Sequence, residues 1–310
     1  MILTVTLNTS IDKAYTVEGF EAGRVHRVKG VSATAGGKGI NVAMVVAALG
    51  EEVAATGFVG GYSGEFIKRG LDQAGIKNEF VDTQGETRTC INIIDETTGL
   101  QTELLEPGPL LNKSCEDKFN EKYESLLGIS DVIVISGSMP GGIRPDFYAQ
   151  LVSRAKQKGI KVIFDTSGRY LKEGMAARPT VIMPNKSEAE GISGRKINEE
   201  KDILEIIETF MESGIEMPFI TLGEEGGYAA MNGDIYRYIP PKIKTANAVG
   251  CGDAMAAGLA VAVCRGYTGE RALRLAAATS SANAMTKVTG CVQKKDVERL
   301  FDKVDIKKLS

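Results

Sequence analysis

The sequence predicts an α/β fold in which a doubly wound, mostly parallel sheet is flanked by helices. The first observation is a series of short, β-prone apolar runs at residues 2–7, 53–59, 132–135, 162–164, 181–183 and 219–222. The second is that stretches with 3.6-residue apolar periodicity lie between most of these runs, for example 41–49, 147–158 and 203–213. Strands that alternate with helices pair in parallel through βαβ crossovers, which place helices on both faces of the sheet. The length of 310 residues fits one large α/β domain, residues 1–310, or one domain with a small appendage.

Two parts of the chain depart from this alternation. After residue 222, the runs 226–230 and 235–239 flank Asn232-Gly233 and predict a hairpin, which two helical stretches at 251–265 and 270–285 follow. The polar-interleaved, β-prone stretches 15–31 and 90–105 lie where crossovers are expected. We interpret them as strands of a small β-sheet lid, contributed by about residues 12–32 and 88–106. The pattern alone leaves a pair of ordinary surface hairpins equally open.

Charge and composition exclude several classes of protein. The formal net charge is −3 and the pI is near 5.6, so no basic face of the kind that binds nucleic acid is indicated. The five cysteines have no C-x-x-C spacing and His26 is the single histidine, which argues against a zinc site or a redox motif. The longest apolar runs, such as 254–264, are too short to cross a bilayer, and no signal peptide is recognisable. We therefore expect a cytoplasmic protein with no nucleic-acid or membrane partner.

The segment 247–258 predicts an anion-binding helix start. Gly250 and Gly252 permit a tight turn, and a helix of small residues begins at about Asp253. Unpaired N–H groups at such a start converge on one point and bind an anion. An aspartate there would repel a phosphate, unless its carboxylate takes the proton of an incoming hydroxyl while the amides hold the transferred phosphoryl group. On this motif alone, an ordinary N-cap role for Asp253 is slightly the better interpretation.

A second glycine-rich loop, residues 32–41, runs into the helix predicted at 41–49. Its spacing matches neither the Walker A motif nor the G-x-G-x-x-G motif of dinucleotide-binding folds. The glycines permit close approach of a ligand, Lys38 supplies a cation, and Asn41 supplies both an amide donor and an acceptor. This combination suits a phosphosugar better than a nucleotide.

Together, the Gly-Gly-Lys-Gly-Ile-Asn stretch (36–41) and the Gly-Cys-Gly-Asp-Ala-Met-Ala-Ala-Gly stretch (250–258) resemble the two signatures of the PfkB, or ribokinase-like, carbohydrate kinases. The similarity covers essentially the whole chain. Stretches 7–12 and 85–88 resemble the branch of 1-phosphofructokinase and tagatose-6-phosphate kinase, and stretch 102–109 leans towards the latter. The resemblance implies phosphorylation of a ketohexose monophosphate to the 1,6-bisphosphate, with ATP and Mg²⁺. Tagatose 6-phosphate is the first expected substrate, and fructose 1-phosphate is the alternative.

The resemblance also assigns residues to the two substrates. Asp253 is the expected base, and the expected anion hole consists of the amides of Gly250, Cys251 and Gly252. The expected sugar site comprises Asp12, Gly36, Gly37, Lys38 and Asn41, with Ser138 in its floor and Arg88, Asn92 and Arg27 for the phosphate and its neighbouring hydroxyls. Arg27 would reach across a homodimer formed by the lids. The expected nucleotide site comprises Asn185, Thr221, Gly223 and Gly226, Glu188 that orders Mg²⁺ through water, and Ala277 and Ser281 beside adenine. Close helix packing is the alternative explanation of the last two.

Two residues depart from the pattern of the branch. Met183 stands where a lysine usually precedes Pro-Asn, so a cation near the γ-phosphate is missing unless Lys186 replaces it. Cys251 stands in place of alanine or serine, and its thiol at a helix N-terminus is expected to be unusually acidic. Met183 keeps open a non-catalytic regulator that binds a sugar phosphate. A kinase of nucleosides or free sugars is disfavoured by three cations, namely Lys38, Arg88 and Arg27.

Overall fold

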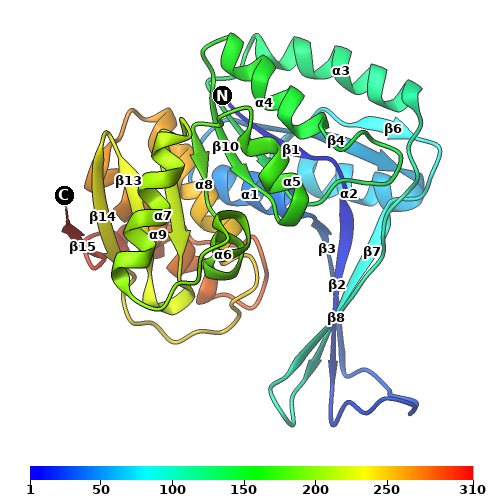
Figure 1. Cartoon of the computed structure of the whole chain (residues 1–310). Helices are drawn as coiled ribbons and strands as arrows, with labels where there is room; N and C mark the ends of the chain where they lie inside the picture. The colour runs from blue at the N-terminus through cyan, green and yellow to red at the C-terminus, as the bar shows by residue number, and fades with distance from the viewer. Residues whose placement is uncertain (310) are drawn as a thin grey trace.

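The computed structural model describes residues 1–309 and contains two sheets (Figure 1). In the main sheet the parallel strands are β1 (Ile2–Thr6), β4 (Val53–Gly60), β5 (Lys77–Asn78), β6 (Val81–Thr83), β9 (Val132–Ser136), β10 (Lys161–Asp165), β11 (Val181–Ile182) and β12 (Met217–Thr221). Its antiparallel edge comprises β13 (Gly227–Met231), β14 (Asp234–Ile239) and β15 (Asp305–Lys308). The strand order is β15-β14-β13-β12-β11-β10-β9-β1-β4-β5, and β6 pairs with β4. The predicted doubly wound, mostly parallel sheet is confirmed.

Helices cover both faces of this sheet and enclose two hydrophobic cores. One core includes α1 (Lys38–Ala48), α2 (Gly61–Gln73), α8 (Cys251–Cys264), α9 (Gly269–Ala284) and α10 (Lys294–Phe301). The other includes α3 (Lys113–Leu127), α4 (Phe147–Gln157), α5 (Gly168–Met175), α6 (Lys186–Ser193) and α7 (Glu200–Glu212). Successive residues of a strand point to opposite faces, so Val132 and Val134 enter the first core and Ile133 and Ile135 the second. The central strands are therefore apolar on both sides.

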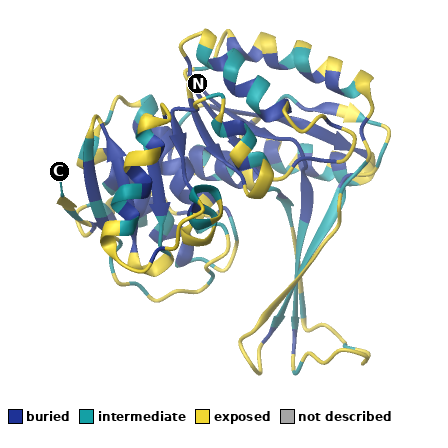
Figure 2. Cartoon of the chain, in the orientation of Figure 1, coloured by how far each residue is buried: buried dark blue, intermediate teal, exposed yellow. Residues whose placement is uncertain are grey.

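The second sheet projects from the body of the molecule (Figure 1). It consists of β2 (Ser10–Val17), β3 (Gly30–Gly36), β7 (Arg88–Asp95) and β8 (Gln101–Leu105), in the order β3-β2-β7-β8. Because β2 and β7 pair in parallel from Ser10↔Arg88 to Val17↔Asp95, two distant segments form one sheet and the alternative of separate surface hairpins is wrong. Figure 2 shows this arm as largely exposed or half-buried, in contrast to the buried main sheet. We call these four strands the lid.

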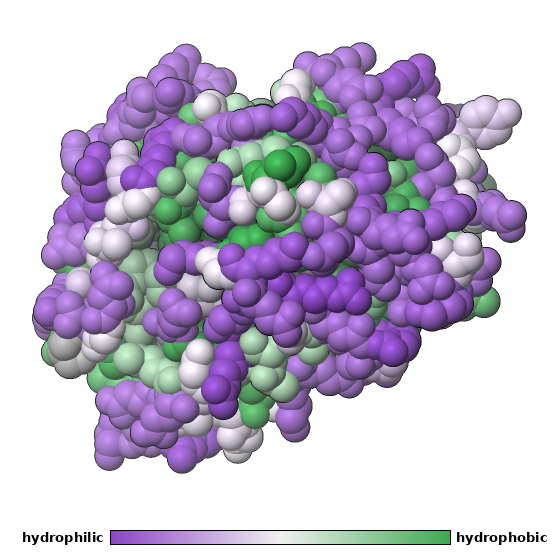
Figure 3. Space-filling view, turned by 90° about the horizontal axis from the view of Figure 1, so that it is seen from above, coloured by the Kyte–Doolittle hydropathy of each residue, from purple (hydrophilic) through white to green (hydrophobic). Residues whose placement is uncertain are grey.

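The remaining elements agree with the sequence-based expectation in type and differ at their ends. The helix expected to begin at about Asp253 begins at Cys251, and β11 is limited to two residues, with Pro184 shortly after it. A 3₁₀ turn, η1 (Gly223–Glu225), follows β12. Among residues 1–309, no helix combines the length and the apolar character needed to cross a membrane. The face in Figure 3 is mostly hydrophilic, with hydrophobic side chains grouped near its centre.

Candidate active site

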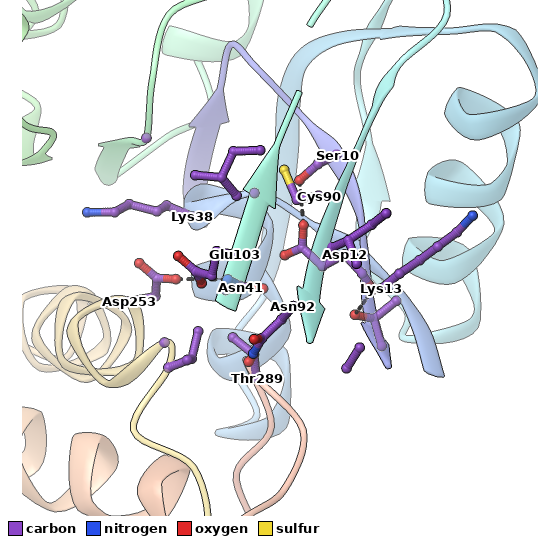
Figure 4. A pocket seen from close by; sticks show the side chains of 18 of the residues that line it. Ser10, Asp12, Lys13, Lys38, Asn41, Cys90, Asn92, Glu103, Asp253 and Thr289 are labelled. Carbon is purple, nitrogen blue, oxygen red and sulfur yellow. Dashed lines mark hydrogen bonds between the residues drawn. The ribbon is translucent and has the colours of Figure 1, made fainter. Parts of the chain in front are cut away.

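A cavity of about 480 Å³ lies between the lid and the body, lined by the starts of α1 and α8. It brings together ten of the residues that the sequence assigns to chemistry or to the sugar, namely Asp12, Gly37, Lys38, Asn41, Arg88, Asn92, Ser138, Gly250, Gly252 and Asp253. Asp12 and Asp253 are the two of these residues that lie farthest apart in the sequence, at a separation of 241 positions, and the fold brings them to the same cavity. We call this space the sugar cavity. Figure 4 shows Asp12 and Asn92 on the lid strands and Asp253 on the opposite side.

Asp253 is 5% exposed, and its Oδ2 accepts a hydrogen bond of 2.8 Å from Nδ2 of Asn41 (Figure 4). Burial raises the pKa of this carboxyl to about 7, and the negative charges of Asp165 and Asp12 act in the same direction. Lys38 and the hydrogen bond from Asn41 oppose the rise. A carboxyl group with a pKa near neutrality is suited to accepting a proton from a hydroxyl group.

The start of α8 has the geometry of an anion site. Its N-cap is Gly250, in the left-handed region at φ 80° and ψ 5°, and no side chain of the described residues caps the helix. The N–H groups of Gly252 and Asp253 find no acceptor within residues 1–309. Asp253 is the third residue of the helix, so the interpretation of Asp253 as an ordinary N-cap is wrong.

Lys38 lies at the start of α1, and its Nζ is 3.3 Å from Oδ2 of Asp165 at the end of β10. The negative charge of Asp165 raises the pKa of Lys38, and Asp253 and Glu188 also act on the ammonium group. In Figure 4 the side chain extends away from Asp12. Lys38 therefore supplies positive charge among three carboxylates close to the start of α8, rather than beside the lid.

Arg88 has less freedom to bind a phosphate than the sequence implies. Its Nη1 donates to the carbonyl of Glu106 at 3.0 Å and its Nη2 to the carbonyl of Asn8 at 3.1 Å, whereas Nε is buried and has no partner among residues 1–309. Asn8 in turn donates from Nδ2 to Oγ of Ser138 at 3.1 Å. Arg88 thus ties the base of the lid to the body, and these two contacts use two of the five N–H donors of its guanidinium group.

Further up the lid, Asn92 and Glu103 are directly opposite each other on β7 and β8 and line the same cavity. Asn92 donates from Nδ2 to Oε1 of Gln101 at 2.8 Å, and its Oδ1 is buried with no hydrogen-bond partner in the described part of the chain. Asp12 accepts a hydrogen bond of 2.6 Å from Oγ of Ser10. The inner face of the lid therefore offers mainly acceptors, which suit the hydroxyl groups of a sugar.

A second cavity, of about 680 Å³, lies on the other side of the α8 start. Of the residues expected to bind nucleotide, it is lined by Thr221, Gly223, Gly226, Ala277 and Ser281, together with Cys251. Gly252 lines both this cavity and the sugar cavity. Ser281 donates its hydroxyl hydrogen to the carbonyl of Ala277 within α9, at 2.8 Å. We call this space the nucleotide cavity.

Asn185 and Glu188 form a capping box at the start of α6. Oδ1 of Asn185 accepts from the N–H of Glu188 at 3.0 Å, and Oε2 of Glu188 accepts from the N–H of Asn185 at 2.9 Å. Asn185 and Thr221 line a further, polar cavity of about 640 Å³. Burial raises the pKa of Glu188, and the charge of Lys38 opposes this. Capping leaves the second carboxylate oxygen of Glu188 available to a ligand.

Three assigned residues lie outside the sugar cavity. Arg27 is exposed in the segment between β2 and β3, and it does not line the cavity of its own chain. Gly36 is packed against Asp12, whose carboxylate carbon would lie 2.1 Å from an added Cβ. Cys251 faces the nucleotide cavity, and the expectation of an unusually acidic thiol is wrong, because burial raises its pKa.

Sequence reasoning missed several residues of the site. Glu103 lies within a stretch that was used only as a branch signature, although the alternation of lid strands places it on the same face as Asn92. Asp165 follows an apolar strand at its carboxyl end, where ligands gather in α/β sheets, and this signal was available in the sequence. Lys287 and Thr289 line the sugar cavity from the loop after α9, for which the sequence carries no comparable signal.

Comparison with known proteins agrees with this arrangement. The pattern of the pfkB family of carbohydrate kinases matches residues 5–295. A tagatose-6-phosphate kinase from Staphylococcus epidermidis is 38% identical over 309 residues, which cover 99% of each chain. The structure of phosphofructokinase-2 from Escherichia coli with substrates and products has a TM-score of 0.91 and 27% identity, over 97% of this chain and 98% of the other. A possible 1-phosphofructokinase from Thermotoga maritima has a TM-score of 0.88 and 26% identity, over 100% of both chains.

Two separated glycine motifs, the sheet that joins them and a family match that spans residues 5–295 lead to one conclusion. The chain belongs to the pfkB family of carbohydrate kinases and is an ATP-dependent sugar phosphotransferase.

Proposed function

We propose that this kinase transfers the γ-phosphoryl group of ATP to O1 of tagatose 6-phosphate, forming tagatose 1,6-bisphosphate and ADP. The observation that carries the proposal is the position of the α8 start between the two cavities, with Gly252 lining both and Asp253 facing the sugar cavity. A phosphoryl group at this point is within reach of both substrates. The 38% identity with a tagatose-6-phosphate kinase supports the choice of sugar.

The proposed reaction is a direct in-line displacement. The carboxylate of Asp253 accepts the proton of the sugar hydroxyl as its oxygen forms a bond to the γ-phosphorus. The bond between the γ-phosphorus and the bridging oxygen breaks, and ADP leaves with that oxygen. The amides at the α8 start and the ammonium group of Lys38 stabilise the charge on the transferred group.

Mg²⁺ would neutralise charge on the triphosphate when it is bound with ATP. Mg²⁺ is usually held by one or two carboxylates together with substrate phosphates, so we expect the phosphates of ATP to supply most of its ligands. The free oxygen of Glu188 fits a role in ordering the ion through water.

The cavity lining also supports a phosphorylated sugar as acceptor. Two cations line the sugar cavity beyond Lys38, namely Arg88 and Lys287, and acceptors on the lid face the space between. A charged hydrogen bond to a phosphate contributes about 1.5–3 kcal/mol, so a free hexose should be a much poorer substrate than its phosphate. Fructose 1-phosphate is the second candidate, favoured by the fold shared with a possible 1-phosphofructokinase.

We further propose that two chains pair through the outer faces of their lids. Tyr15, Val31, Ile93 and Leu104 lie on the face opposite to Asp12 and Asn92, because side chains alternate along each strand. Val31 and Leu104 are 63% and 54% exposed in the single chain. Pairing would cover this apolar face.

ADP release with Mg-ATP tests the function, using tagatose 6-phosphate, fructose 1-phosphate, fructose 6-phosphate and free fructose in parallel. We expect the highest kcat/KM with tagatose 6-phosphate. A preference for fructose 1-phosphate would move the assignment to the sister activity. A folded protein that binds a sugar phosphate and leaves ATP intact would instead support a regulator.

A further inference from the structure

Asn283, near the end of α9, is fully buried and lines neither the sugar cavity nor the nucleotide cavity. Its side chain joins two loops that both reach the site. Nδ2 donates to the carbonyl of Val249 at 3.0 Å, and Oδ1 accepts from the N–H of Gly290 at 3.1 Å. Asparagine is suited to this bridge because its amide carries a donor and an acceptor a fixed distance apart.

The first bridge bears on the anion site through the geometry of the peptide bond. The carbonyl of Val249 and the N–H of Gly250 belong to one planar trans peptide, so they point in opposite directions. When Asn283 holds the carbonyl on the buried side, the N–H of Gly250 is directed to the other side of that peptide. Gly250 and Gly252 both line the sugar cavity, and within residues 1–309 no side chain caps α8 to hold this turn in place.

The second bridge bears on the expected base. Gly290 packs on Asn41, since a Cβ added to this glycine would lie 3.1 Å from Cα of Asn41. Asn41 donates the hydrogen bond to Asp253. By fixing the N–H of Gly290, Asn283 therefore supports the backbone that lies behind Asn41.

We propose that Asn283 is a positioning residue, which sets the direction of the amides at the α8 start and the placement of Asn41 without touching either substrate. This inference rests on the proposed role of the α8 start in binding the transferred phosphoryl group. Asn247 makes comparable links, accepting from the N–H of Val249 at 3.0 Å and donating to Oγ1 of Thr289 at 3.3 Å. Asn247 also lines the sugar cavity, so its substitution could change contact with the substrate as well as the position of the loop. Substitution of Asn283 tests positioning alone.

Asn283→Leu, of similar size, removes both bridges, and Asn283→Ala does so with less steric demand. Thr279→Val is the matched control, because Thr279 is fully buried one turn earlier on α9 and its hydroxyl bonds to the carbonyl of Leu275 within the same helix. We expect kcat to fall roughly 10- to 100-fold in both Asn283 variants, since misdirected donors no longer meet the transition state. KM for ATP and for the sugar phosphate should change less than about threefold, and Thr279→Val should keep wild-type kcat.

The decisive readout is binding of ADP with aluminium fluoride, which mimics the transferred phosphoryl group, compared with binding of ADP alone. We expect affinity for the mimic to fall in parallel with kcat while affinity for ADP is retained. Unchanged kcat in a folded Asn283 variant would overturn the inference, as would a loss of ADP affinity as large as the loss of kcat. Hydrolysis of ATP, in which water is the acceptor, is measured alongside. The variants can then be compared with the wild type even if tagatose 6-phosphate is not the natural acceptor.

Discussion

Nδ2 of Asn41, in the first turns of α1, donates a 2.8 Å hydrogen bond to Oδ2 of Asp253, in the first turn of α8. This contact joins the two glycine motifs of the sequence at one carboxylate. It also leaves the other oxygen of Asp253 free to face a hydroxyl group. The contact makes the acid–base behaviour of Asp253 dependent on a residue 212 positions away.

Asp253→Asn should lower kcat by roughly 10²- to 10⁴-fold, because an amide cannot accept the proton of the sugar hydroxyl. Circular dichroism and ADP binding check that the fold and the nucleotide cavity are intact. Turnover close to that of the wild type would contradict the assignment of the base.

The same substitution should stabilise the protein at neutral pH. Burial raises the pKa of Asp253 from 3.8 to about 7, so the folded state binds a proton that the unfolded state releases. The stability that this carboxyl contributes is full below about pH 4 and is lost as the pH rises to about 7. Asn carries no charge to bury, and we expect about 1–2 kcal/mol of stabilisation at pH 8 from urea unfolding. Equal stability of the two proteins at pH 8 would contradict the raised pKa.

The pH profile should follow the same group. We expect kcat/KM to rise with pH and to level off above about pH 7, because the base must be deprotonated. The hydrogen bond from Asn41 lowers this pKa, so Asn41→Leu should move the midpoint to higher pH. A midpoint that stays at the wild-type value in Asn41→Leu would show that another group controls the profile.

Lys38→Met should lower kcat/KM by roughly 10- to 150-fold, which corresponds to the loss of about 1.5–3 kcal/mol for a charged hydrogen bond. The loss should fall mainly on kcat if Lys38 serves the transferred phosphoryl group, as its pairing with Asp165 near the α8 start indicates. Lys29→Met, which removes a lysine paired with Glu18 on the lid, is the matched control. A change confined to KM for the sugar phosphate would place Lys38 in the sugar site instead.

Leu104→Asp should weaken lid pairing, because a charge on the apolar outer face cannot be buried without a partner. Light scattering over a range of concentrations measures the effect. Leu110→Asp, at a position that is 83% exposed outside the lid, is the control. If both variants keep the wild-type mass, the lid face is not the interface.

The sequence predicts the fold well where one physical signal dominates. Apolar runs locate the central strands, and the two glycine motifs locate the starts of α1 and α8. The contacts that specialise the site are less visible, because they depend on tertiary placement. Glu103 enters the cavity through its register with Asn92, and Arg88 is held by the carbonyls of Asn8 and Glu106. Asn185 and Glu188 show the opposite case. The resemblance assigns both residues to the nucleotide, but their capping box at the start of α6 already gives them a local structural role.

The backbone conformation of Gly250 limits which residues can occupy the start of α8. A side chain at this position would need φ 80° and would place Cβ 2.5 Å from Cγ2 of Thr289, so two independent constraints demand glycine. The neighbouring Cys251, by contrast, contributes a backbone amide that is the same whatever side chain the residue carries. A substitution at 251 that keeps the backbone shape therefore leaves this amide in place, provided that the new side chain fits beside the nucleotide cavity. At the start of α8 the phosphate site therefore depends on the conformation of the backbone. Substitutions there should be tolerated only if they preserve that conformation.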